Sequence, residues 1–496
     1  MHPDLLPVIV GVGQINDRPD NPLEGRDPVA LMAEALRAAE ADAGASLLAD
    51  ADWIGVVQQI AFPEIADASG PVADALGAAK AERIQSKGPN GDSPILLLNE
   101  AANRIGAGEI RIALVTGAEA LRTAGARKAA ASGGPKPDAL RDATHRVKVG
   151  YAQSHGLVVP TDVYPLYENA LRAHLGQSLA EGQAESGEIW SRFSAVAASN
   201  PAAWIRKPVT AEEVITPSDR NRPIAFPYTK LQVANAAVNQ GAGFIVMAAG
   251  EARARGIPEA KWIYVGNGAA AHEANSVLAR DGYVHSAGMD VSIRKTMELN
   301  QLAVDDLAAV ELYSCFPCVP KMARRVLGWP VDKPATVFGG LTFGGGPIGN
   351  YMSHAVASMA LKLRETGGTG LLFANGGYAT HNHTIAVSTQ PIPAASFPRA
   401  YDFQADADAR RGPVPELDQD YTGPAHVESY TVFYDREGQP RSGVIVARTD
   451  GGKRTLAHVP ASDAATIARL QGQGAEPVGA SGNITAGEPL RTWQFA

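Results

Sequence analysis

The sequence predicts an α/β protein built from two repeated units and followed by a small β domain. Three observations support this prediction. Apolar strand-like segments alternate with helix-like segments through residues 1–392. The pattern of the opening strand returns after residue 260, which indicates an internal repeat. Beyond residue 425 the chain changes to short strands separated by turn residues. A chain of 496 residues is also long enough for two or three domains.

Composition excludes several classes of protein. The chain has 44 Lys and Arg against 52 Asp and Glu, a net charge of −8, so no basic excess is available to neutralise nucleic-acid phosphates. No basic region precedes the first apolar run, and no apolar run approaches the ~20 residues of a membrane span. Two cysteines fit a reducing compartment. We therefore expect a cytoplasmic protein with no nucleic-acid partner and no membrane span.

The first unit opens with a buried strand at Pro7–Gln14 that ends in Gly11-x-Gly13. An amphipathic helix follows at Asp27–Ala43. A strand leading into glycines is also typical of dinucleotide-binding folds, but Asn16 stands where the third glycine of that motif belongs. A helix at 93–106, beginning with a proline, and a strand at 110–116 complete the unit.

The second unit repeats this plan. Lys261–Gly268 copies the opening strand with its Gly-x-Gly, Pro347 is expected to start a helix as Pro94 does, and Gly368–Gly377 copies the strand at 110–118. Residues 1–255 and 256–392 are therefore predicted to be two α/β halves around a mostly parallel sheet. Their loop-bearing ends should meet, with a site between them.

An insertion of about residues 121–235 interrupts the first half, with helices expected around Pro165–Leu179 and Glu188–Ala198. Its basic residues suit an anionic ligand, or simply a solvated loop. They are Arg122, Arg127, Lys128, Lys136, Arg141, Arg146 and Lys148. A linker at 393–424 leads to the β domain at 425–496. Its expected strands, which suggest a barrel, are Ser429–Tyr434, Gly443–Arg448 and Arg454–Val459.

Gly339–Asn350 contains six glycines in twelve residues, so it is predicted to be a loop. A helix follows directly at Tyr351–Arg364. Backbone N–H groups at such a helix start suit an anion or a developing oxyanion, and a tight turn with close packing is the alternative.

Cys315-x-x-Cys318 raises the possibility of redox chemistry. A zinc site would need two further ligands. His381 and His383 are the only close pair of histidines, and nothing in the sequence brings them near the cysteines. The sequence therefore predicts no metal site.

Several segments together resemble the thiolase superfamily, in particular the thiolase-like type 1 proteins related to sterol-carrier-type thiolases. The resemblance covers essentially the whole chain. It rests on the opening Pro-Val-Ile-Val-Gly, on Gly339-Gly with Pro347-x-Gly349, and on the segments 101–109, 239–247 and 304–312. It implies a thiolase-like tandem repeat of two α/β units with an inserted loop domain, an additional small C-terminal β domain, and a monomer or homodimer.

The family's catalytic groups are missing at the matching positions. The nucleophilic cysteine falls at about Gly91, the activating Gly-His-Pro reads Gly345-Gly346-Pro347, and the second cysteine motif reads Ala374-Asn375-Gly376. Glycine and alanine side chains can neither attack a thioester nor carry a proton. The resemblance therefore implies an acyl-CoA site lined by these glycine-rich loops, with degenerate catalysis.

Other side chains near these loops are candidates for the lost roles. Tyr313 matches the position of an oxyanion-binding histidine in the sterol-carrier type, and Tyr378 and His381 follow the second cysteine loop. A tyrosine pair in a dry site can exchange a proton with a carbonyl or hydroxyl. Tyr378 could equally be a core aromatic with its hydroxyl bonded. Cys315 is a candidate substitute nucleophile, with packing as its alternative role.

The resemblance implies an atypical acyltransferase, akin to acetyl-CoA acetyltransferases, or an acyl-CoA carbon–carbon lyase. A non-catalytic CoA- or acyl-CoA-binding protein is the alternative. CoA or its thioester would be the substrate or ligand, with no covalently bound cofactor. Its phosphates should rest on the insertion, where the expected contacts are Arg220, Arg222, Tyr228 and Lys230.

Overall fold

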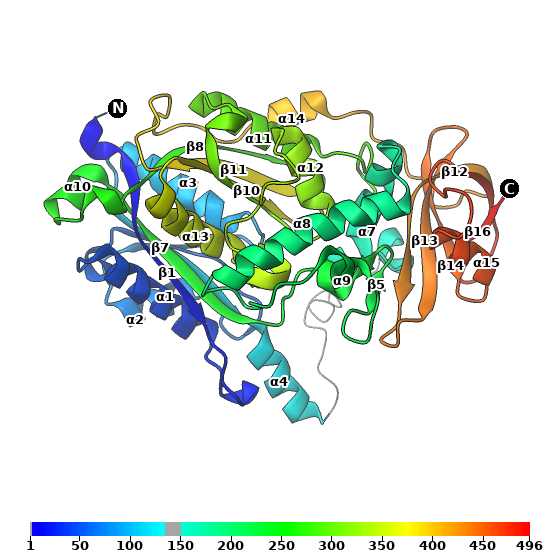
Figure 1. Cartoon of the computed structure of the whole chain (residues 1–496), viewed down its shortest axis with the longest axis horizontal. Helices are drawn as coiled ribbons and strands as arrows, with labels where there is room; N and C mark the ends of the chain where they lie inside the picture. Colours follow the sequence, from blue (N-terminus) through cyan, green and yellow to red (C-terminus); the bar gives the residue numbers. More distant parts are fainter. Residues whose placement is uncertain (1, 134–149) are drawn as a thin grey trace.

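The computed structural model describes residues 2–133 and 150–496, and its centre is a nine-stranded sheet (Figure 1). In spatial order its strands are β3 (Glu82–Gln85), β2 (Trp53–Val56), β4 (Ile112–Ala120), β7 (Asn239–Ala248), β1 (Pro7–Asn16), β8 (Ile263–His272), β11 (His381–Ser388), β10 (Thr369–Gly376) and β9 (Leu307–Leu312).

The strand arrangement repeats about the middle of this sheet. In the first half β1 pairs antiparallel with β7, β7 antiparallel with β4, and β4 parallel with β2. In the second half β8, β11, β10 and β9 follow in the same order with the same directions. The halves join where β1 pairs with β8, through Val8 opposite Tyr264 and Ile9 opposite Ile263. The predicted tandem α/β repeat is confirmed.

The prediction of a mostly parallel sheet is wrong. Only the pairs β2–β3, β2–β4 and β9–β10 are parallel, and five pairs are antiparallel. For the pair β10–β11 the connection explains the difference. Residues 377–380 alone link β10 to β11, and a parallel pair needs a crossover of a dozen or more residues.

Helices surround this sheet, and all but α4, which extends away from it, cover its faces in layers (Figure 1). They are α1 (Pro28–Ala43), α2 (Ser69–Leu76), α3 (Ser93–Gly106), α4 (Leu121–Ser132), α10 (Ala249–Ala254), α11 (Ala287–Asn300), α12 (Cys318–Leu327), α13 (Tyr351–Thr366) and α14 (Gln404–Arg410). Helix α1 begins where the Asp27 side chain accepts the Ala30 N–H at 2.9 Å, and it ends at Gly44, whose φ is +78°. Helices α3 and α13 contact strands of both halves and are largely buried, so they form the layer between the halves.

The insertion is mainly helical, with α6 (Tyr151–Ser154), α7 (Pro160–His174), α8 (Leu179–Ser199) and α9 (Ala211–Ile215). Helix α7 starts five residues earlier than predicted because Pro160 occupies its first turn, and Pro165 lies inside the helix. Arg122, Arg127 and Lys128 lie on α4. The other predicted basic residues, Lys136, Arg141, Arg146 and Lys148, lie outside the described residues.

The C-terminal strands close into a small barrel, at the right of Figure 1. Its strands are β12 (Gly423–Tyr434), β13 (Pro440–Thr449), β14 (Arg454–Pro460), β15 (Ser481–Thr485) and β16 (Thr492–Phe495), with helix α15 (Ala464–Leu470) between β14 and β15. Closure follows because β12 pairs with both β13 and β15. The insertion adds β5 (Pro223–Ala225) and β6 (Tyr228–Thr229) to this sheet through Ala225 opposite Phe433. The predicted C-terminal β domain is confirmed.

No helix in residues 2–133 or 150–496 is long and apolar enough to cross a membrane.

Candidate functional site

Loops of the two halves meet at Gly91, just before α3. A Cβ added to Gly91 would overlap the carbonyl oxygen of Asn375 and the hydroxyl oxygen of Tyr313, and would lie 2.7 Å from Tyr313 Cζ. A Cβ on Gly376 would lie 2.9 Å from the Gly91 nitrogen. The space that a side chain at position 91 needs is therefore filled, chiefly by Tyr313.

The Tyr313 hydroxyl faces Gly91 and makes no hydrogen bond among the described residues. The residue follows β9, where its backbone N–H donates to the Phe373 carbonyl oxygen at 3.1 Å. Its ring packs edge-to-face on Tyr351, with 5.6 Å between centroids. Burial raises the pKa of Tyr313 well above its ordinary value, so the phenol keeps its proton at neutral pH. It presents an O–H donor at Gly91, close to where the resemblance predicts the nucleophile.

Three titratable side chains interact near the start of α3. Asp92 is buried at the start of α3, and burial raises its pKa to about 6 against the opposing charge of His272. His272 ends β8 and His381 begins β11 directly opposite it, with their Nδ1 atoms 3.2 Å apart. One of these nitrogens must donate and the other accept, so the pair shares one proton there.

Burial also sets the charge of this histidine pair. It lowers the pKa of His272, with His381 adding to the shift and Asp92 opposing it. Burial likewise lowers the pKa of His381, with a further contribution from the Arg280 guanidinium. Both imidazoles are therefore mainly neutral at pH 7, the form that accepts a proton.

Of these three residues, the sequence identifies only His381. Asp92 lies next to the predicted Gly91, but no motif selects it. His272 lies four residues beyond the predicted end of its strand. The one available signal is the repeat itself, because two adjacent antiparallel strands with a histidine at each facing end bring the two rings together.

Two other predicted residues serve as anchors in this structure. The Tyr378 hydroxyl donates to the Val158 carbonyl oxygen at 2.9 Å, so its donor is occupied. His383 is fully buried, with Nε2 3.3 Å from Asn99 Oδ1 and its ring stacked on Tyr401. Burial lowers the pKa of His383 to about 3, which keeps it neutral.

Both cysteines are buried free thiols. Burial raises the pKa of Cys315 to about 12, so almost none of it is the nucleophilic thiolate at neutral pH. Within residues 2–133 and 150–496, no three His, Cys, Asp or Glu side chains cluster so as to hold a metal ion.

The glycine-rich loop packs tightly. Residues Gly340–Gly344 form a π-helical turn, and α13 begins at Tyr351, four residues after Pro347. Gly345 has φ of +108°, and a Cβ there would lie 2.7 Å from Gln240 Cδ. The Gly346 N–H donates to the Asn235 carbonyl oxygen at 2.9 Å, so it does not point freely into a site. Gly345 and Gly346 therefore allow the loop backbone to pack closely against Gln240 and Asn235.

Glu311 holds the start of this loop from the end of β9. It is completely buried, and it accepts hydrogen bonds from Val337 N (2.8 Å), Thr336 Oγ1 (2.9 Å) and the Tyr351 hydroxyl (2.7 Å). Burial raises its pKa to about 7, although the Tyr351 bond opposes the shift.

Glu311 should therefore make stability depend on pH. Between its ordinary pKa of 4.5 and about 7 the unfolded chain loses this proton while the folded chain keeps it, so the free energy of unfolding should fall as pH rises. We expect up to about 1.4 kcal/mol per pH unit from this group. Urea unfolding of wild type and Glu311→Gln from pH 4.5 to 8 measures the difference. Parallel pH profiles would contradict the expectation.

A cleft of about 950 Å³ lies between the insertion and the barrel. Arg222 and Tyr228 line it from the insertion, and Tyr434 and Arg436 from the barrel. The residues predicted to contact the CoA phosphates do not all line this cleft. Arg222 faces the cleft, and Arg220 and Lys230 are exposed but do not line it. Tyr228 is buried, with its hydroxyl bonded to Glu168 at 2.9 Å.

A column of aromatic rings runs from this cleft to the loops around Gly91. The Tyr228 and Phe316 centroids are 5.7 Å apart, and Phe316 stacks on Tyr164 at 4.6 Å. The Tyr164 hydroxyl donates to Asn375 Oδ1 at 2.9 Å. The column links the cleft physically to the candidate site.

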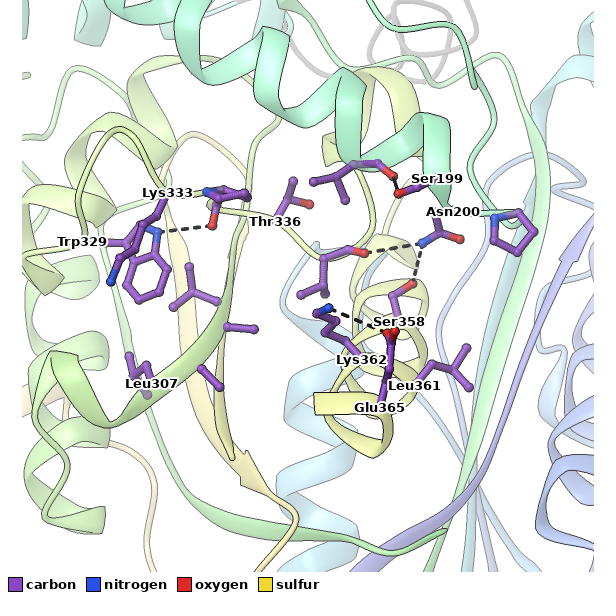
Figure 2. A pocket seen from close by; sticks show the side chains of 17 residues that line it. Ser199, Asn200, Leu307, Trp329, Lys333, Thr336, Ser358, Leu361, Lys362 and Glu365 are labelled. Atoms are coloured by element: carbon purple, nitrogen blue, oxygen red, sulfur yellow. Dashed lines mark hydrogen bonds and ion pairs between the residues drawn. The ribbon is translucent and has the colours of Figure 1, made fainter. Parts of the chain in front are cut away.

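A second groove, of about 770 Å³, follows the outer edge of β9 (Figure 2). Asn200 bonds Ser358 on one side of it, and Lys362 pairs with Glu365 at 3.7 Å. None of the catalytic or substrate-binding residues predicted from the sequence lines this groove.

Comparisons with known proteins agree with this architecture. Residues 404–488 match the family model of the thiolase-like protein type 1 additional C-terminal domain. No curated protein matches the chain. Two solved structures resemble the fold at low identity, each covering 78% of this chain. They are an Ltp2-ChsH2(DUF35) aldolase (19% identity, 98% of its chain, TM-score 0.60) and human mitochondrial 3-ketoacyl-CoA thiolase in complex with CoA (15%, 99%, 0.57).

A third structure is similar over its full length. It is a monomeric SCP2-thiolase like protein type 1 from Mycobacterium smegmatis, with 31% identity, complete coverage of both chains and a TM-score of 0.83. Identity at this level over the whole chain, the repeated sheet and the C-terminal barrel together show that this chain belongs to the SCP2-thiolase like proteins of type 1.

Proposed function

We propose that this protein is an acyl-CoA carbon–carbon lyase that works by proton transfer and forms no covalent acyl-enzyme. One observation carries the proposal: the Tyr313 hydroxyl, which makes no hydrogen bond within residues 2–133 and 150–496, occupies the space at Gly91, where the resemblance predicts the nucleophile, and it interacts with Asp92, which in turn interacts with the His272–His381 pair. Covalent acyl transfer finds no support, because Gly91 has no side chain and the Cys315 thiol is protonated.

The chemistry suits a 3-hydroxyacyl thioester. A neutral histidine of the pair takes the proton of the β-hydroxyl, the bond between Cα and Cβ breaks, and an aldehyde or ketone leaves. The electron pair moves into the thioester as an enolate, whose oxygen accepts a hydrogen bond from Tyr313. Protonation of Cα then gives the shortened acyl-CoA. The aldolase named among the fold relatives makes this reaction class a natural one to test first.

The cleft between the insertion and the barrel suits the CoA end of such a substrate. Its volume of about 950 Å³ is that of a ligand site, and Arg222 supplies a guanidinium for a phosphate. We expect Arg222→Ala to weaken CoA binding by about 1–3 kcal/mol, the worth of charged hydrogen bonds, and Arg220→Ala, outside the cleft, to weaken it less. Isothermal calorimetry measures both dissociation constants. An unchanged dissociation constant for Arg222→Ala would remove Arg222 from the site.

A non-catalytic CoA- or acyl-CoA-binding protein is the second candidate. The aromatic column favours it, because Phe316 and Tyr164 are buried and fill the direct route from the cleft to Gly91. A lyase would need these rings to move when substrate binds. The relative from Mycobacterium smegmatis is monomeric, and we infer the same state for this chain.

One screen separates the two candidates. Acyl-CoA and 3-hydroxyacyl-CoA thioesters of several chain lengths are incubated with the protein, with and without an aldehyde acceptor, and the products are identified by mass spectrometry. Release of an aldehyde or ketone, or condensation in the reverse direction, supports the lyase. Binding by calorimetry without turnover of any thioester supports the binding protein.

A further inference from the structure

We infer that the additional C-terminal domain, residues 404–488, positions the His272–His381 pair, so that this domain is a structural part of the candidate site. The inference rests on the proposed function of that site. Four side chains of the domain reach the chain on either side of the pair: Gln404, Arg411, Arg448 and Arg454.

Arg454 makes the firmest of these contacts. It is completely buried at the start of β14, and it forms a two-point ion pair with Glu428 at 2.6 and 2.8 Å. Its Nη1 donates to the carbonyl oxygens of Leu278 (2.7 Å) and Arg280 (2.6 Å). Arg448 adds a bond to the Asp281 carbonyl oxygen at 3.2 Å. The barrel thus fixes the backbone of residues 278–281, which lie between β8 and α11.

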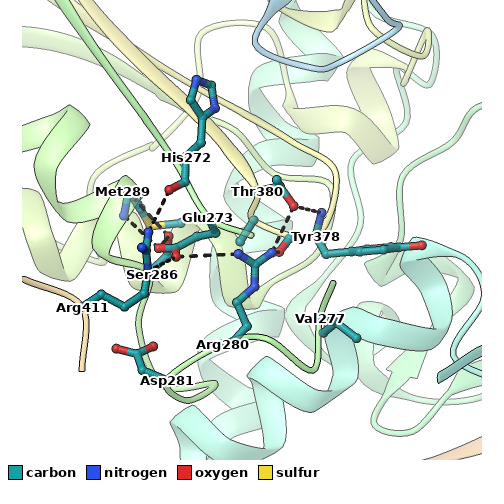
Figure 3. Close-up of polar contacts among 12 residues, drawn as sticks. His272, Glu273, Val277, Arg280, Asp281, Ser286, Met289, Tyr378, Thr380 and Arg411 are labelled. Carbon is teal, nitrogen blue, oxygen red and sulfur yellow. Dashed lines mark hydrogen bonds and ion pairs between the residues drawn. The ribbon is translucent and has the colours of Figure 1, made fainter. Parts of the chain in front are cut away.

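Arg280 links this segment to the turn that precedes His381, and Figure 3 shows its contacts with Tyr378 and Thr380. Its side chain is 2% exposed, and Nη2 donates to the Tyr378 carbonyl oxygen and to Thr380 Oγ1, both at 3.0 Å. The Thr380 carbonyl oxygen in turn accepts the Glu273 N–H at 2.8 Å. The turn at 377–380, which precedes His381, is therefore anchored to residues 278–281, the segment that the barrel fixes.

The first histidine is held by the start of the same domain. Gln404 accepts the His272 N–H at 2.8 Å and donates to the His272 carbonyl oxygen at 2.9 Å. Arg411 Nη2 donates to that same carbonyl oxygen at 3.0 Å, and Arg411 Nε donates to Glu273 at 3.0 Å. The domain therefore holds the backbone of His272 directly, and it holds the turn before His381 through Arg280.

These contacts predict a change that can be measured without substrate. The charged and titratable groups facing the pair are Asp92, Asp402 and the neutral His383 at His272 and Arg280 at His381, and burial holds both histidine pKa values low. Lysine cannot make the four bonds of Arg454, because it lacks the planar fork of donors. In Arg454→Lys the two strand ends should loosen and water should enter. The pKa of both histidines should then rise by up to about one pH unit, the usual spread among protein histidines.

The test is an NMR titration of the full-length protein labelled at histidine, with signals assigned through His272→Gln and His381→Gln. Arg469→Lys is the matched control, since Arg469 is in the same domain but stacks on Phe495 away from the pair. We expect both pKa values to rise in Arg454→Lys and that of His272 to rise in Gln404→Leu, with Arg469→Lys like wild type. Should Arg454→Lys not fold, Gln404→Leu alone decides.

Unchanged titrations in the folded variants, or equal shifts in the control, would overturn the inference. The proposed lyase function fails separately, by the absence of thioester turnover in the wild type.

Discussion

Replacing His381 by alanine is expected to lower kcat/KM for the thioester identified by the screen by about 10²–10⁴, the usual contribution of a positioned general base. The reason is geometric. His381 Nδ1 lies 3.2 Å from His272 Nδ1, so each ring orients the other, and Asp92 beside them favours the protonated state that forms after proton uptake. KM should change little, because the substrate's CoA end is bound elsewhere.

The histidine pair should also set the pH dependence of kcat/KM, and His381→Ala should alter that dependence. Since burial holds both histidine pKa values below 6.5, wild-type kcat/KM should fall as pH drops below that value, when the pair becomes protonated. His426→Ala is the control, because His426 is an exposed histidine on the barrel. Full activity of His381→Ala, or a loss shared by His426→Ala, would remove the pair from the mechanism.

Placing a cysteine at position 91, near where the resemblance predicts the nucleophile, should not restore thiolase chemistry. The new Cβ would overlap the Asn375 carbonyl oxygen and the Tyr313 hydroxyl, so the loops must move apart. Overpacking of this kind costs about 1–3 kcal/mol. We expect Gly91→Cys to lower the free energy of unfolding by about that amount and to remain slow to react with iodoacetamide.

Two further variants test the cause of this lower free energy of unfolding. Gly125→Ala, in α4 where a Cβ meets nothing within 4 Å, controls for the added methyl group and should be neutral or slightly stabilising. Gly91→Cys should cost less stability in a Tyr313→Ala background than in wild type, because the tyrosine then no longer competes for the space of the new side chain. Rapid alkylation of the introduced cysteine without loss of stability would show that the loop tolerates a nucleophile.

Much of the fold can be predicted from local patterns. The helix at 93–106 is predicted closely, since Pro94 suits a first turn and the apolar periodicity stops near Gly106 or Gly108. Strand directions cannot be predicted in this way, because Gly368–Gly377 reads as a buried strand whether its neighbour is parallel or antiparallel. The end of β8 is also missed, and His272 with it, because Ala269–Ala271 has low strand propensity and tertiary pairing overrides it.

The candidate site is harder to predict. Family motifs locate Gly91 and Tyr313, but only coordinates can show that the Tyr313 hydroxyl occupies the space beside Gly91. The roles of Arg454 and Gln404 leave no trace in sequence, because each acts through backbone carbonyls or amides far along the chain, and every residue type supplies those.

The pairing of Ala225 with Phe433 bears on how the chain folds during synthesis. Strand β5 meets its sheet partner only after some two hundred further residues have left the ribosome, and β1 must likewise wait for β8. The first half of a nascent chain therefore emerges with open sheet edges and exposed apolar faces. Such non-local pairing slows folding and makes incomplete chains prone to aggregation, so this protein should depend on chaperones until its last strands appear.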